Sequence, residues 1–376
     1  MNSSPHHHST ISASYSGCSW RKRLELALLL ISLVSLLTGC DSTTPEADLG
    51  LYDAGMTTVT PEEVGWSSAR LEEVRQHAES LGTAALMILV DGEVVAAWGA
   101  VERTFVMASI RKSLLSALYG IYRHEGQLDL SRTMADLGID DEPPLTDAEK
   151  QATVAALLKS RSGIYHEAAA ETQEARNARP PRGSHAPGAF WYYNNWDFNA
   201  LGAIFEQETG VGIFEAFKAR IADPIGMQDF RVDEAFYAFE RHFSIHPAYH
   251  FRLSARDLAR FGQLMLQQGQ RQGTSIIPAE WVAESTTAFT ATGDRGTKSG
   301  YGYMWWVTTN DDQFPEMGIK NGTYTASGNG GQRLTVLPHL GAVVVHLMNT
   351  YRINGPRIGT TQYDPLLKQI IEARIE

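Results

Sequence analysis

Met107-Ala108-Ser109-Ile110-Arg111-Lys112-Ser113-Leu114-Leu115 places a serine and a lysine three residues apart at the start of a predicted helix. Positions i and i+3 of a helix project from the same face, so the Lys112 amine can reach the Ser109 hydroxyl. A serine hydroxyl is a poor nucleophile unless an adjacent base takes its proton. The helix N-terminus adds unpaired N–H groups and a partial positive charge where an oxyanion can form. Because this spacing also occurs in ordinary solvated helix starts, the rest of the chain must decide.

The composition indicates a globular protein that does not bind nucleic acid. The chain has 376 residues, enough for two domains or for one large domain with an insertion. Hydrophobic residues make up 43%, and the formal net charge is −11, with no long run of Lys and Arg to offset it. An acidic chain without a basic patch is a poor ligand for nucleic acid.

Residues 1–39 are predicted to be a lipoprotein signal peptide. A basic cluster, Arg21-Lys22-Arg23, precedes the apolar run 26–37, which is shorter than the roughly 20 residues needed to span a bilayer. The run ends in Leu37-Thr38-Gly39-Cys40, which resembles a bacterial lipobox, so we expect cleavage before Cys40 and lipidation of its thiol. An uncleaved signal anchor is the alternative. The protein is therefore expected to be exported and held at the membrane by its lipid alone, on the periplasmic or cell-surface side.

Cysteine usage agrees with this interpretation. Cys18 would be discarded with the signal peptide and Cys40 would carry the lipid, so no thiol remains for a disulfide or a catalytic cysteine. Residues 40–58 are rich in Ser, Thr, Asp, Gly and Pro and are predicted to be a flexible tether.

Strand patterns on both sides of a helical middle predict the fold. An Asp91-Gly92 turn joins two apolar strands, and strand patterns return after residue 300, whereas helical spacing dominates residues 127–246. We therefore predict an α/β (α+β) domain from residues 59–126 and 247–376, with an antiparallel sheet flanked by helices, and an all-helical insertion at 127–246. The polar, Arg-rich segment 167–184 is predicted to be an exposed loop over the site.

A second motif is Trp191-Tyr192-Tyr193-Asn194-Asn195, at the start of another predicted helix. Tyr193 and Asn195 are two residues apart, so both can point into one cleft from a tight loop. A phenol beside a lysine ammonium is expected to have a lowered pKa and can relay a proton, while an Asn amide both donates and accepts hydrogen bonds. Core packing is the preferred interpretation for the nearby Trp196 and Phe198.

A third motif is Tyr324-Thr325-Ala326-Ser327-Gly328-Asn329-Gly330-Gly331-Gln332, a strand that becomes glycine-rich and then re-enters a strand. Glycines let a substrate lie close to the backbone, and an N–H at that edge can complete an oxyanion hole. A phosphate-binding loop is excluded because no Gly-Lys-Ser/Thr follows. A plain β-turn is the alternative.

Together, in this order, the three motifs resemble the serine β-lactamase and penicillin-binding-protein superfamily, specifically its class C β-lactamase-like branch of esterases, D-aminopeptidases and amide hydrolases. Ser-x-x-Lys is a known signature of that superfamily. The stretches 153–163 and 301–306 are also similar to family segments, and the resemblance extends from about Pro61 to Ile371. It implies a β-lactamase/transpeptidase-like fold.

The resemblance also implies a role for each motif residue. Ser109 is the nucleophile, Lys112 its activating base and Tyr193 the shuttle that protonates the leaving group. Asn195 contacts Lys112 and the substrate. The backbone N–H groups of Ser109 and Asn329, next to Gly328, form the oxyanion hole.

The third motif departs from the family pattern at one position. Where relatives have Lys-Thr-Gly or His-Thr-Gly, this chain has Ala326-Ser327-Gly328 and lacks the charged or imidazole group that usually helps to hold a β-lactam carboxylate. A similar loss accompanies the branch that resembles 6-aminohexanoate-dimer hydrolase, which also has Gly-Gln after the motif, here Gly331-Gln332. We therefore predict a serine hydrolase that cleaves a small ester or amide through an acyl-enzyme, without a metal or cofactor.

Two alternatives remain open at this point. One is a DD-peptidase or weak β-lactamase that acts on peptidoglycan or β-lactams, and the other is a non-catalytic penicillin-binding-like lipoprotein. A Gly-x-Ser-x-Gly elbow, which an α/β-hydrolase would need, is absent from the sequence.

Four histidines are further candidates. His242, His246 and His250 recur every four residues, the spacing of a metal site on one helix face, but Pro247 interrupts that helix and favours loop histidines. His185 precedes Tyr193 and is a candidate for the wall of the cleft.

Overall fold

An eight-stranded antiparallel sheet organises the computed structural model, which describes residues 56–293, 295–350 and 355–375. Its strand order is β2-β1-β14-β13-β12-β11-β10-β9. The strands are β1 (Ala85–Val90), β2 (Glu93–Gly99), β9 (Thr290–Ala291), β10 (Gly300–Tyr301), β11 (Trp306–Val307), β12 (Tyr324–Gly328), β13 (Gln332–Leu337) and β14 (Ala342–Leu347). The predicted hairpin is confirmed as β1 and β2, and β1 then pairs with β14 from Ala85↔Leu347 to Val90↔Ala342. The sheet thus joins the two ends of the folded chain, as the sequence predicted.

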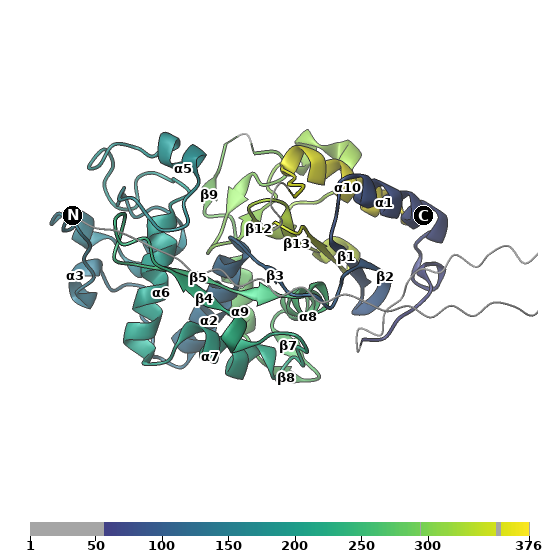
Figure 1. Ribbon diagram of the computed structural model, residues 1–376, viewed down its shortest axis with the longest axis horizontal. Helices are drawn as coiled ribbons and strands as arrows, with labels where there is room; N and C mark the ends of the chain where they lie inside the picture. The colour runs from purple at the N-terminus through teal and green to yellow at the C-terminus, as the bar shows by residue number, and fades with distance from the viewer. Residues whose placement is uncertain (1–55, 294, 351–354, 376) are drawn as a thin grey trace, which may run out of the picture. The chain divides into compact units, whose positions relative to one another are not determined.

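Helices cover both faces of the sheet (Figure 1). The helices α1 (Ser68–Ser80) and α10 (Thr360–Glu372) share one apolar cluster with Ile88, Val344 and their neighbours, while α2 (Ile110–His124) and α8 (Ala255–Leu266) share the cluster on the other face. Because β14 is buried along its whole length, apolar residues occupy both of its faces. The prediction of an antiparallel sheet flanked by helices is confirmed.

The remaining elements are short apart from α6. They are β3 (Phe105–Val106), α3 (Met134–Leu137), α4 (Val154–Leu158), α5 (Gln173–Ala178), α6 (Asn195–Thr209), α7 (Ile213–Phe217), β4 (Phe236–Ala238), β5 (Ala248–His250), β6 (Arg252–Leu253), β7 (Gln270–Arg271), β8 (Thr274–Ser275) and α9 (Ala279–Ser285). Single turns of 3-10 or π helix occur at Pro61–Val64, Glu149–Gln151, Lys218–Ala222, Val232–Glu234, Asp311–Gln313, Pro315–Met317 and Pro338–Leu340.

Two details of the sequence prediction were wrong. The segment 127–246 is not all-helical, because β4 lies within it and pairs with β5 just beyond the predicted boundary. The segment 167–184 is not a wholly exposed loop, because it contains α5 and buries Ala168, Ala169 and Glu171. Small side chains and a carboxylate paired with Arg179 allow this polar-looking segment to pack inward. The division of the chain into two domains stays a prediction.

The predicted signal peptide, Cys40 and all but the last three residues of the predicted tether lie outside the described residues. Within those that are described, the structure contains no helix with the length and hydrophobicity needed to cross a membrane.

A substitution at Gly262 can test how tightly α8 packs on the sheet. A Cβ atom at this position would lie 2.5 Å from Val343 Cγ1 and 2.7 Å from Leu334 Cδ1, both on fully buried residues. Gly262→Ala should therefore lower the free energy of unfolding by about 1–2 kcal/mol, since overpacking outweighs the better helix propensity of alanine. Urea denaturation measures this change.

The matched control for Gly262→Ala is the double variant with Val343→Ala, which removes the nearer clash. The effects of the two substitutions on the free energy of unfolding should be less than additive, because the new Cβ at position 262 would contact the Val343 side chain. A single variant as stable as the parent protein would show that α8 does not pack on the sheet as closely as described.

Candidate active site

Ser109 lies at the point where the chain turns from β3 into α2. Ala108 before it has φ 47°, a left-handed conformation that is uncommon for residues other than glycine and that occurs often at functional sites. Ser109 is only half-buried, whereas residues 110–122 of α2 are all buried. The Ser109 hydroxyl therefore faces a cavity from the N-terminal end of the buried helix α2.

Lys112 lies one turn into α2 and is 1% exposed. Its Nζ is 3.0 Å from Ser109 Oγ, 2.7 Å from Tyr193 OH and 2.7 Å from Asn195 Oδ1. Burial, and then the charge of Arg111, lower the pKa of Lys112 well below its ordinary value, while Glu171 opposes this shift. A lysine with a lowered pKa can be neutral at moderate pH and can accept the proton of the adjacent serine.

Tyr193 forms an aromatic wall beside this lysine. Its ring stacks on Trp306 with centroids 5.2 Å apart and meets Tyr301 edge-on at 6.0 Å. Burial raises the pKa of Tyr193 to about 12, so the expectation of a lowered value was wrong. The reason is that the same burial pushes Lys112 towards its neutral form, which removes most of the stabilisation that an ammonium would give a phenolate. Tyr193 is therefore a proton donor in the resting site.

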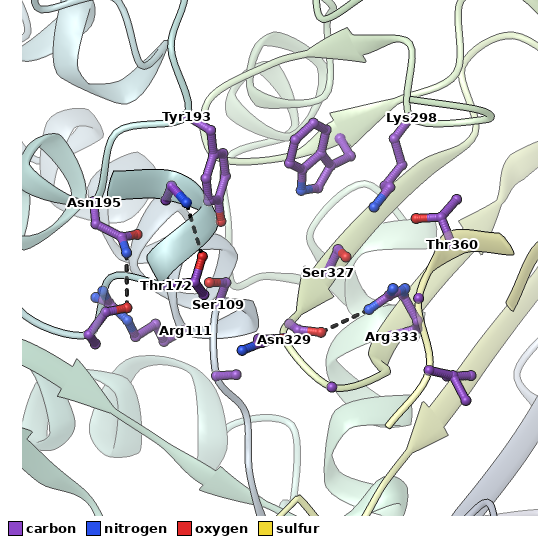
Figure 2. A pocket seen from close by; sticks show the side chains of 18 of the residues that line it. Ser109, Arg111, Thr172, Tyr193, Asn195, Lys298, Ser327, Asn329, Arg333 and Thr360 are labelled. Carbon is purple, nitrogen blue, oxygen red and sulfur yellow. Dashed lines mark hydrogen bonds between the residues drawn. The ribbon is translucent and has the colours of Figure 1, made fainter. Parts of the chain in front are cut away.

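Asn195 is the first residue of α6, and Asn194 caps that helix by accepting a hydrogen bond from the Trp196 N–H at 3.2 Å. The Asn195 side-chain amide both accepts and donates a hydrogen bond. Its Oδ1 accepts from Lys112 Nζ, and its Nδ2 donates to the Ala170 carbonyl at 2.9 Å. The second of these bonds is drawn in Figure 2. Asn195 thus joins Lys112 to the segment 167–184.

The third motif lies against the Ser109 turn. A Cβ atom on Gly328 would be 2.5 Å from the Met107 carbonyl oxygen, so only glycine lets β12 approach this closely. Within the described part of the chain, the backbone N–H groups of Ser109 and Asn329 have no hydrogen-bond acceptor, and both residues line the same cavity. Two free amides beside a serine hydroxyl can stabilise an oxyanion.

The motif residues surround one cavity of about 400 Å³ (Figure 2). Ser109, Tyr193, Asn195, Gly328 and Asn329 all line it, and Lys112 lies buried behind them. The sequence analysis gave no place in this wall to several other lining residues, among them Arg111, Lys298, Trp306, Arg333 and Thr360. Thr172 also lines it, from the segment predicted to lie over the site, and so does His250, which was a candidate only for a metal site. One sequence signal among them is Arg333, a charged residue next to Gln332 at the start of a strand.

The histidines do not form a shared site. His185 lies away from the cavity wall because its ring stacks on Phe190 at 4.2 Å, so its proposed place in the cleft was wrong. His242 is in a turn, His246 Nε2 donates to the Asp140 carbonyl at 2.9 Å, and His250 lies in β5. Across residues 56–293, 295–350 and 355–375, no cluster of His, Cys, Asp and Glu has the grouping needed to hold a metal ion.

The chain resembles known proteins in sequence and in fold. Residues 69–367 match the family model described as Beta-lactamase. A 6-aminohexanoate-dimer hydrolase from Paenarthrobacter ureafaciens is 24% identical over 317 residues, which cover 74% of this chain and 76% of the relative.

Two solved structures are similar in fold. A penicillin-binding protein homologue from Caulobacter crescentus has a TM-score of 0.60 at 16% identity and covers 82% of this chain and 99% of its own. EstCE1, described as a hydrolase with promiscuous acyltransferase activity, has a TM-score of 0.57 at 17% identity, with 81% and 97% covered. Since the family model spans most of the chain, the protein belongs to the Beta-lactamase family of hydrolases.

Proposed function

We propose that the protein is a serine hydrolase of the class C β-lactamase-like branch that cleaves a small ester or amide through an acyl-enzyme on Ser109. The observation that carries the proposal is the position of the Lys112 amine. It lies within hydrogen-bond distance of both Ser109 Oγ and Tyr193 OH, at 3.0 and 2.7 Å, in a buried environment. These are the distances that proton transfer from a nucleophile to its base requires.

Acylation would proceed in two steps. The neutral Lys112 amine takes the proton of Ser109 as Oγ attacks the substrate carbonyl, and the N–H groups of Ser109 and Asn329 stabilise the resulting oxyanion. The tetrahedral intermediate then collapses and breaks the bond to the leaving alcohol or amine. Tyr193 gives its proton to the leaving atom and recovers one from Lys112, so the relay ends neutral.

Deacylation would reuse the same groups. A water molecule loses its proton to the relay of Tyr193 and Lys112 and attacks the ester carbonyl of the acyl-enzyme. The bond to Ser109 Oγ breaks, and the serine regains a proton. No step in this sequence needs a group that the chain lacks.

The names of two matched proteins support an ester or amide bond as the target. One is a 6-aminohexanoate-dimer hydrolase, and the other is a hydrolase with promiscuous acyltransferase activity.

Relatives with a Lys or His in the third motif have it at the position of Ala326. The Ala326 side chain is fully buried and does not line the cavity.

A DD-peptidase or weak β-lactamase is the second candidate function. The observation that favours it is the presence of two cations, Lys298 and Arg333, elsewhere in the cavity wall. A non-catalytic scaffold is disfavoured, because it has no need of a buried lysine with a lowered pKa beside a half-exposed serine.

We also propose that the mature chain begins at a lipidated Cys40 and is anchored to the membrane on its outer side. The support is the sequence of the signal segment alone. Intact mass measurement of the protein purified from a bacterial host should give residues 40–376 plus a diacylglycerol group, and Cys40→Ser should abolish the lipid. A mature chain that retains residues 1–39 would contradict the proposal.

Covalent labelling tests the nucleophile. A fluorophosphonate should add once to the protein, and peptide mapping should place the adduct on Ser109. Ser109→Ala should abolish labelling, whereas Ser80→Ala, at an exposed serine of α1, should label like the parent protein.

Parallel exposure to penicillin and to a panel of small esters separates the candidate functions. Turnover of esters without a stable penicilloyl adduct is the expected result. A long-lived penicilloyl adduct on Ser109 would favour the DD-peptidase candidate, and no adduct with any reagent would overturn the hydrolase proposal.

A further inference from the structure

Arg111, the residue before Lys112 in α2, is a buried cation that the relay described above does not use. It is 2% exposed, and Figure 2 shows it beside Asn195 at one end of the cavity. Its Nη2 donates to Asn199 Oδ1 at 2.6 Å, and its guanidinium lies 4.3 Å from the centroid of the Tyr249 ring. Among the described residues it forms no ion pair, and its Nη1 has no hydrogen-bond partner. Buried arginines are usually paired with a carboxylate, so this environment calls for an explanation.

Asn199 holds the guanidinium of Arg111 in place. It is 1% exposed, and its Nδ2 donates to the Ala169 carbonyl at 3.1 Å. Asn199 follows Asn195 by four residues in α6, so both side chains lie on one face of that helix. Asn195 joins Lys112 to the next carbonyl of the chain in the same way. Two asparagines of α6 therefore join two adjacent basic residues of α2 to two adjacent carbonyls.

The partner of Arg111 is a neutral amide, although a carboxylate would have nearly the same shape. An aspartate in place of Asn199 could accept the same hydrogen bond from Nη2. The amide oxygen accepts that bond but carries no net charge, so it holds the guanidinium without neutralising it. In a buried site the effective dielectric constant is far below that of water, and a charge that is not neutralised acts strongly on its neighbours.

Three titratable groups face this charge, namely Lys112 on the same helix, Tyr193 before α6 and His250 of β5. Burial lowers the pKa of Lys112, and the charge of Arg111 is the next cause. Burial lowers the pKa of His250 to about 3, and Arg111 is again the second cause. Burial raises the pKa of Tyr193, and the hydrogen bond with Ser109 and the charge of Arg111 oppose that rise. Arg111 thus shifts each group towards its deprotonated form.

Glu171, from the segment 167–184, acts on Lys112 in the opposite direction. It raises the pKa of the lysine by less than Arg111 lowers it. The Glu171 carboxyl group is paired with Arg179, and burial raises its pKa. Arg111 is therefore the charged group that acts most strongly on Lys112 among the described residues.

We propose that Arg111 is a positioning residue that acts on catalysis through Lys112. Its charge, fixed by the Asn199 amide and left without a counter-ion, keeps Lys112 in the neutral form that accepts the proton of Ser109. This inference rests on the proposed function and adds to it a residue outside the relay of serine, lysine and tyrosine. An Arg111 that only packed α2 against the Tyr249 ring would instead change the labelling rate of Ser109 by the same factor at every pH.

Two substitutions of Asn199 separate charge from packing. Asn199→Asp places a carboxylate against the guanidinium, and Asn199→Leu removes the bond to the Ala169 carbonyl without adding a charge. The pH profile of Ser109 labelling by a fluorophosphonate should have a midpoint about one pH unit higher in Asn199→Asp, because the positive charge near Lys112 is neutralised. Below the midpoint, the labelling rate should be about tenfold lower than in the parent protein. Asn199→Leu should keep the midpoint of the parent.

Substitution of the arginine gives a second comparison. Arg111→Met removes the charge and should raise the midpoint by about one pH unit. Arg123→Met is the matched control, because Arg123 is an exposed arginine of α2 that pairs with Glu284 outside the cavity, and it should leave the midpoint unchanged. Asn199→Asp decides the question if Arg111→Met fails to fold. An unchanged midpoint in Asn199→Asp or in a folded Arg111→Met, or an equal rise in Asn199→Leu, would each overturn the role of Arg111.

Direct titration of Lys112 separates this inference from the proposed function. In protein labelled with carbon-13 at the lysine Cε atoms, the Lys112 signal is the one missing from the NMR spectrum of Lys112→Arg, and its chemical shift reports the midpoint. The midpoint should be about one pH unit higher in Asn199→Asp and unchanged in Asn199→Leu, whether or not any ester is hydrolysed. Equal midpoints in these two variants and the parent protein would overturn the role of Arg111 even if a fluorophosphonate labels Ser109.

Discussion

The buried amine of Lys112 is the group on which the rest of the site depends. An ammonium without a counter-ion is costly to bury, and the protein supplies three oxygen atoms around it, from Ser109, Tyr193 and Asn195. A neutral amine has two N–H groups and one lone pair, which match an acceptor amide, a phenol and a serine hydroxyl. The environment that holds the lysine in place therefore also favours its basic form.

The sheet keeps these groups together. Gln332 at the start of β13 donates to the carbonyls of Val106 and Met348 and accepts from the Met348 N–H, so one amide joins β3 to the end of β14. Gly328 then allows β12 to approach the Ser109 turn. The third motif thus positions β12 beside the Ser109 turn without a charged side chain. The Lys or His that relatives have at the position of Ala326 can therefore be absent while the other motif residues still line the cavity.

Local patterns predicted the parts of the fold that depend on local physics. The β1–β2 turn followed from Asp91-Gly92, whose φ values are both positive. Tertiary burial is not visible in the sequence. The sequence therefore predicts a lowered pKa for Tyr193, whereas burial raises it, and an exposed segment 167–184, whereas Ala168, Ala169 and Glu171 are buried. Lys298 and Arg333 belong to no recognised motif and meet only because β10 and β13 belong to one sheet.

The pH dependence of Ser109 labelling tests the central claim about Lys112 most directly. A base must be neutral to accept a proton, and a lowered pKa keeps it neutral down to a lower pH, so the labelling rate should reach its plateau well below pH 10.5. The rate should fall as the pH drops through the lowered pKa of Lys112. Lys112→Arg, which stays protonated, should label at least 100-fold more slowly at every pH. A rate in Lys112→Arg equal to that of the parent protein, or a parent rate that still rises towards pH 10.5, would contradict the assignment of Lys112 as the base.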